Sequence, residues 1–97
     1  MNSNNYLSPH PQAAFRVVDQ AAIVVLADSG EVKILNEVGT RVWELADGSR
    51  RVQEIIETIV SEFDVSLDQA VQEVTQFVEE LVHAKMLVVH DQPLIST

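Results

Sequence analysis

Hydrophobic and polar positions divide the chain into a strand-like first third and a helical remainder. Residues 22–27 form a continuous aliphatic, largely β-branched run, and residues 31–35 alternate polar with apolar side chains, as strands do. Residues 28–30 lie between these runs and favour a turn, because their glycine can take a positive φ. A shorter run at residues 15–19 predicts a further strand. We therefore expect a small antiparallel sheet of two or three strands.

Beyond the sheet, apolar positions recur at the three- and four-residue spacing that is typical of helices. The predicted helices cover residues 38–45, 52–63 and 67–84. Asn36 is placed to cap the first of these helices, and Ser66 is placed to cap the third. Apolar residues at positions 86–89 predict a short closing strand. The expected fold class is α+β, in a winged-helix-like order of small sheet, three helices and terminal strand.

Two residues of the first predicted helix stand out by their size. Trp43 is the single tryptophan, and we expect it to anchor the core between this helix and the sheet, with direct ligand contact as the alternative. Gly39 lowers helix stability by about 1 kcal/mol relative to Ala. We therefore expect another segment of backbone to approach the helix closely at Gly39.

Length and composition indicate a single domain. The chain has 97 residues, of which 46% are hydrophobic, and this size does not divide into two independent cores. We expect a flexible tail over residues 1–12, one domain over residues 13–90 and a second loose tail over residues 91–97. Neither a signal-peptide pattern nor an apolar run long enough to cross a bilayer is present, so we expect a cytoplasmic protein that does not enter membranes.

The charge of the chain argues against binding to nucleic acid. Fifteen acidic residues face six Lys and Arg, which gives a formal net charge of −9. Affinity for nucleic acid comes mainly from basic groups that neutralise phosphates. The third predicted helix lies where a winged-helix transcription regulator would place its recognition helix, yet it is acidic. A regulator of this kind is therefore the weaker of two alternatives.

Candidate catalytic and metal-binding residues are few. The chain has no cysteine, and His10, His83 and His90 are scattered along it. Glu79 and His83 are four residues apart on the third predicted helix, but a solvated surface pair explains this spacing better than a metal site does. We expect no catalytic residue, no metal and no cofactor.

A series of motifs resembles a known family. Residues 35–48 read LNEVGTRVWELADG and resemble the LNE-x-G-x-x-x-W-x-L-x-DG signature of the coenzyme PQQ synthesis protein D (PqqD) family. The segments VQEI at residues 52–55, FDV at 63–65 and FVEEL at 77–81 follow at the spacings usual in that family. The resemblance covers about residues 15–89, and its specificity lies in the combination and order of the motifs.

The resemblance implies a function that composition does not show. Members of this family, also called RiPP recognition elements, bind the leader region of a ribosomally made precursor peptide without catalysing a reaction. They present the peptide to a modifying enzyme, typically a radical SAM protein. In this mode the leader adds as an antiparallel strand to the outer strand of the sheet and packs against the third helix, which is β-augmentation.

The implied peptide-binding residues lie on the last strand of the sheet and on the third helix. They are Glu31, Val32, Lys33, Ile34, Leu35, Val74, Val78, Leu81 and Val82. About half of the four helical residues are expected to belong wholly to the core. An exposed strand edge could equally support self-association, so an oligomerisation module, such as a homodimer, is the other alternative.

One departure from the family pattern concerns the end of the third helix. Relatives often carry Gly there, whereas this chain has Lys85. Lys85 must then take or avoid a left-handed conformation, which costs about 1 kcal/mol relative to Gly.

Overall fold

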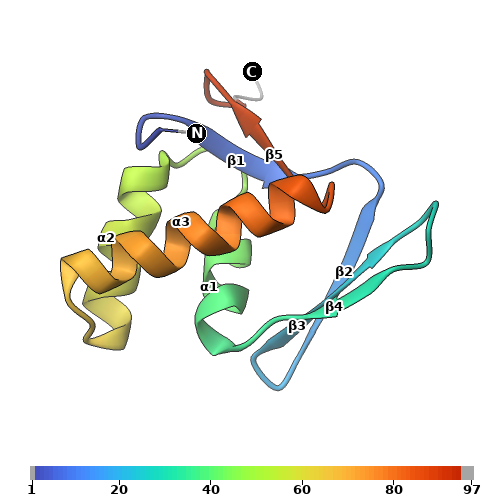
Figure 1. Ribbon diagram of the computed structural model, residues 1–97, viewed down its shortest axis with the longest axis horizontal. Coiled ribbons are helices and arrows are strands. Elements are labelled where there is room, and N and C mark those ends of the chain that lie inside the picture. Colours follow the sequence, from blue (N-terminus) through green and yellow to red (C-terminus); the bar gives the residue numbers. More distant parts are fainter. Residues whose placement is uncertain (1, 95–97) are drawn as a thin grey trace.

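The fold consists of two small antiparallel sheets and three helices, as Figure 1 shows for the computed structural model, which describes residues 2–94. The α+β class expected from the sequence is confirmed. The elements are β1 (Tyr6–Pro9), β2 (Ala13–Val18), β3 (Ala21–Leu26), β4 (Val32–Ile34), α1 (Glu37–Leu45), α2 (Val52–Phe63), α3 (Leu67–His83) and β5 (Leu87–His90). The helices gather on one side, and α3 runs across both α1 and α2 in this view.

The larger sheet has the strand order β2-β3-β4, so β3 is central and both β2 and β4 are edges. β3 pairs with β2 in a register that sets Phe15 opposite Val24, and it pairs with β4 in a register that sets Lys33 opposite Val24. The turn between β3 and β4 ends at Gly30, which has a φ of 71°. The expected hairpin is therefore present, with the glycine in the conformation that the turn requires.

The second sheet differs from the expectation of a flexible tail over residues 1–12. Within the described part of that segment, β1 pairs antiparallel with β5, and Leu7 stands opposite Val89. Leu7 is fully buried, so the strand is held by core packing as well as by its ladder of hydrogen bonds. At the other end, Leu94 N–H donates to the Gly48 carbonyl at 2.8 Å. The rest of the expected C-terminal tail, residues 95–97, lies outside the described residues.

At the start of each helix a side chain accepts a hydrogen bond from a free backbone N–H group. The Asn36 side chain accepts a hydrogen bond from Gly39 N–H at 2.8 Å, and Ser66 Oγ accepts one from Gln69 N–H at 3.2 Å. At the start of α2, Glu54 reaches back to accept from Arg51 N–H at 2.9 Å. These contacts confirm the caps expected at Asn36 and Ser66.

Trp43 is buried to 2% exposure, which confirms its expected role as a core anchor. Its ring meets Phe15 of β2 edge to face, with centroids 5.4 Å apart, so α1 is fastened to the larger sheet. Gly39 is also closely approached, but not by backbone as expected. The Phe77 ring of α3 occupies the space where a Cβ atom of residue 39 would lie, because an aromatic side chain, rather than a crossing strand, faces this turn of α1.

Lys85 takes the left-handed conformation, with a φ of 62°. Its N–H donates to the Val82 carbonyl and Met86 N–H donates to the Leu81 carbonyl, so these bonds end α3 and turn the chain into β5. Across the described part of the chain, no helix is long and apolar enough to cross a membrane.

Candidate functional site

The outer edge of β4 carries backbone groups that the sheet leaves unpaired. Leu35 N–H donates to the Ala22 carbonyl and Leu26 N–H donates to the Glu31 carbonyl. Residues 31, 33 and 35 therefore turn their backbone groups toward β3, and by the alternation of an antiparallel ladder residues 32 and 34 turn theirs outward. An edge of this kind is a template for an additional strand.

The side chains of β4 divide between the two faces of the sheet. Val32 is 57% exposed and Ile34 is 71% exposed, and both point away from the core. Lys33 points to the helical side, where its ammonium group forms an ion pair with the Glu80 carboxylate of α3. This ion pair connects the edge strand directly to α3, although the two residues are 47 positions apart in the sequence.

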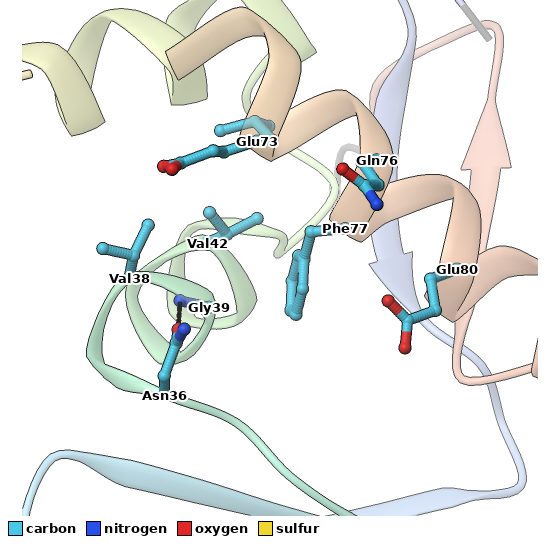
Figure 2. Close-up of a pocket in the computed structure, with 9 residues that line it drawn as sticks. Asn36, Val38, Gly39, Val42, Glu73, Gln76, Phe77 and Glu80 are labelled. Carbon is cyan, nitrogen blue, oxygen red and sulfur yellow. Dashed lines mark hydrogen bonds between the residues drawn. The ribbon is translucent and has the colours of Figure 1, made fainter. Parts of the chain in front are cut away.

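A pocket of about 340 Å³ opens between α1 and α3, beside the end of β4. Figure 2 shows residues of α1 facing residues of α3 across it, with the Phe77 ring pointing from α3 toward α1. Aliphatic side chains and Phe77 supply its apolar surface, and carboxylates and amides surround this surface. The lining residues are Asn36, Val38, Gly39, Val42, Glu73, Val74, Gln76, Phe77 and Glu80.

The structure places the residues implied by the family resemblance in several different environments. Glu31, Val32, Lys33 and Ile34 are exposed or half-buried at the free edge, whereas Leu35 is buried. On α3, Val74 is 1% exposed and reaches the pocket wall, while Val78 and Leu81 are fully buried in the core. Val82 is half-buried and lines a separate hollow of about 250 Å³ with Val89.

Sequence reasoning did not single out the α1 side of the pocket or the polar face of α3 as part of a binding site. Val38 and Val42 are four residues apart on α1, while Glu73, Phe77 and Glu80 recur at three- and four-residue spacing on α3. The spacing shows that each set shares one side of its helix. It does not show that the two sides face each other, which depends on how the helices pack.

The clearest electrostatic perturbation lies away from this pocket. Arg41 of α1 makes a two-pronged contact with Glu62 of α2, with donor–acceptor distances of 2.8 and 3.0 Å. These hydrogen bonds lower the pKa of Glu62 and raise the pKa of Arg41. The pair ties α1 to α2 and holds no reactive group in an unusual protonation state. Within residues 2–94, no three His, Asp or Glu side chains gather as a metal site.

A comparison of the sequence with models of known protein families identifies the family of this chain. The model of the family described as coenzyme PQQ synthesis protein D (PqqD) matches residues 22–87, from β3 to the start of β5. The chain belongs to the PqqD family. The match covers β4, α1 and α3, so the free edge and the pocket both lie in the part shared with other PqqD proteins. No curated protein sequence matches the chain.

Two solved structures share the PqqD fold of this chain. The first is described as TbiB1 in complex with the TbiA(beta) leader peptide; it has a TM-score of 0.77 and 21% identity, and the match covers 82% of this chain and 93% of that one. The second is lasso peptide synthetase B1 complexed with the leader peptide, with a TM-score of 0.75, 20% identity and coverage of 84% and 96%. At these identities the likeness establishes a common fold.

Proposed function

We propose that this PqqD protein binds the leader segment of a ribosomally made precursor peptide by strand addition to β4. The observation that carries the proposal is the free edge itself, where residues 32 and 34 direct their backbone groups outward beside an apolar pocket. Backbone hydrogen bonds supply affinity in this mode, and pockets for side chains supply selectivity. That both structural neighbours are complexes with leader peptides supports the same conclusion.

The side chains proposed to meet the peptide are a narrower set than the family resemblance implies. Lys33 and Ile34 flank the edge, and Val74 contributes to the pocket wall beside it. Val78 and Leu81 are fully buried in the core, so we do not include them among the side chains that meet the peptide. The backbone of Glu31 and Leu35 faces β3, so these two residues hold β4 in register rather than bond to the leader.

In this proposal the protein is an adaptor with no chemistry of its own. It presents the peptide to a separate modifying enzyme, for which a radical SAM protein is the expected class. The same free edge is also a template for a second copy of the chain. Leader and second copy would then compete for β4, so adding peptide should convert any homodimer to a monomer when the mass is measured by light scattering.

The experiment compares the two free edges of one sheet. Random 12-residue peptides displayed on phage are selected on the full chain, and an enriched peptide is synthesised and titrated by calorimetry. Ile34→Pro removes an outward N–H from β4, whereas Val17→Pro removes one from the free edge of β2. Val17 stands opposite Ala22, a residue that bonds toward β4, so its own backbone groups face outward.

We expect Ile34→Pro to abolish peptide binding and Val17→Pro to leave it unchanged. Proline is tolerated on edge strands, so both variants should keep the circular dichroism of the parent protein. Ile34→Thr, which keeps the N–H, should bind within a few-fold of the parent. Strand addition at β4 is wrong if the Ile34→Pro variant binds the selected peptide as tightly as the Val17→Pro variant does.

A further inference from the structure

The pocket beside β4 combines an apolar floor with an acidic rim. Val38 and Val42 of α1 face Val74 and Phe77 of α3 across the floor. The carboxylates of Glu73 and Glu80 stand on the α3 side, two turns apart (Figure 2). A helix rises about 1.5 Å per residue, so these carboxylates are anchored roughly 10 Å apart along one wall.

Negative charge at this rim exceeds the positive charge available to it. Glu80 is paired with Lys33. Among the described residues Glu73 makes no ion pair, and its carboxylate accepts a hydrogen bond only from Gln69 Nε2 at 3.3 Å. Arg41 and Arg50 are engaged elsewhere, with Glu62 and Asp47. At this rim Glu80 therefore has a cationic partner, whereas Glu73 has none among the described residues, in a protein whose net charge is −9.

We propose that the bound peptide places an apolar side chain in this pocket and a Lys or Arg side chain against Glu73 and Glu80. The inference rests on the proposed function, because the peptide must lie along β4 to reach the rim. Side chains two residues apart on a strand point to the same face and lie about 6.7 Å apart. An apolar residue and a cation in an i, i+2 pair can therefore point together toward the α1–α3 side, where the floor and the rim both lie.

Charge complementarity selects this peptide over one with an acidic residue at the same place. An acidic side chain would be repelled by the two carboxylates and could pair only with Lys33, which already pairs with Glu80. A basic side chain could instead pair with Glu73, which has no other cationic partner among the described residues. Like charges placed face to face oppose binding, and rim charges mainly determine partner choice. The basic residue is thus a determinant of specificity, while the backbone ladder along β4 provides the common affinity.

The test determines which peptide residues the protein prefers, from the sequences of peptides selected out of the 12-residue phage library. Selections are run in parallel on the full chain and on its Glu73→Gln/Glu80→Gln and Glu57→Gln variants. Glu57 is exposed on α2 and does not line this pocket, so it controls for a simple loss of charge. All three exchanged residues are exposed, and each variant should keep the thermal midpoint of the parent within a few degrees.

We expect peptides selected on the parent and on Glu57→Gln to be enriched in Lys or Arg two positions from an apolar residue. Peptides selected on Glu73→Gln/Glu80→Gln should lose this enrichment. In calorimetry, exchanging the selected Lys for norleucine should weaken binding to the parent about 1.5- to 5-fold, the range for one exposed ion pair. The same exchange should change nothing for Glu73→Gln/Glu80→Gln.

The outcomes separate this inference from the function on which it rests. Peptides that bind through β4, as judged by Ile34→Pro, but show no basic preference would overturn the acidic-rim inference alone. A basic preference that persists in Glu73→Gln/Glu80→Gln would do the same. If no peptide is enriched, or if binding survives Ile34→Pro, both the strand addition and the inference built on it are wrong.

Discussion

The Phe77 ring packs against α1 at the one residue of that helix that has no side chain, Gly39. A Cβ atom built on Gly39 would lie 2.9 Å from Cε1 of the ring and 3.2 Å from Oδ1 of Asn36. The contact therefore depends on the glycine, and it positions the aromatic wall of the pocket. It also links that wall to the N-terminal cap of α1, since Asn36 accepts from Gly39 N–H.

Gly39→Ala should lower peptide affinity more than it lowers stability. The new methyl group gains about 1 kcal/mol of helix propensity, which offsets much of the strain caused by displacing Phe77. The displaced ring would narrow the pocket, and we expect affinity for a selected peptide to fall about tenfold, as for a misplaced contact worth about 1.4 kcal/mol. Calorimetry and urea denaturation measure the two effects separately.

The double variant Gly39→Ala/Phe77→Leu controls for the origin of that loss. Leucine is shorter than the aromatic ring and leaves room for the methyl group. The effects of the two substitutions on the free energy of peptide binding should then be non-additive by at least about 0.5 kcal/mol, as expected for residues in contact. Strictly additive effects would show that Gly39 acts through something other than Phe77.

Leu7→Ala should destabilise the protein by about 2–4 kcal/mol, the usual cost of emptying a buried leucine site. Leu7 is fully buried on β1, opposite Val89 of β5. Leu67→Ala is the matched control, because Leu67 is 57% exposed and should change stability by no more than about 0.5 kcal/mol. Equal unfolding midpoints in urea for the two variants would mean that β1 does not contribute to the core.

Lys85→Gly should stabilise the protein by about 0.5–1 kcal/mol. Lys85 has a φ of 62°, a conformation that is strained for a residue with a Cβ atom and free of strain for glycine. Lys85→Ala removes the same charge but keeps the Cβ atom, and it should give no stabilisation. A thermal midpoint that rises equally in both variants would attribute the gain to charge instead of backbone strain.

Asp47→Ala should destabilise the protein at neutral pH and lose its effect in acid. Hydrogen bonds from Ser49 Oγ and N–H, with a smaller contribution from Arg50, hold the pKa of Asp47 below its usual value. A carboxylate with a depressed folded-state pKa stabilises the fold above its unfolded pKa of about 3.9, and this contribution disappears as the pH falls through the folded value.

The size of that effect is limited by the exposure of the Asp47 side chain. At pH 7, Asp47→Ala should lower the free energy of unfolding by less than about 1 kcal/mol, as for other exposed charged contacts. Ser49→Ala removes only the hydroxyl donor and should give a smaller loss with the same pH dependence. Urea denaturation at pH 7 and at pH 3 measures both variants, and a loss of equal size at the two pH values would contradict the role of the carboxylate.

Local pattern was sufficient to predict most elements. The apolar stripe of α2 predicts a helix over 52–63, and the structure has the helix at Val52–Phe63. Asn36 and Ser66 cap their helices because capping involves residues only three positions apart. The β3–β4 hairpin follows from two runs and a turn, so its free outer strand could also be expected from sequence.

What sequence alone could not predict depends on contacts between distant segments. β1 has few apolar residues, and its strand exists because it pairs with β5, some 80 residues later. The periodicity of α3 identifies an apolar stripe, but only packing decides that Val78 and Leu81 are core while Phe77 forms the pocket wall. The sequence by itself predicted the free outer strand, β4, to which we expect the peptide to add. The packing of α3 against α1, which no local pattern encodes, determined the pocket and the acidic rim beside that strand.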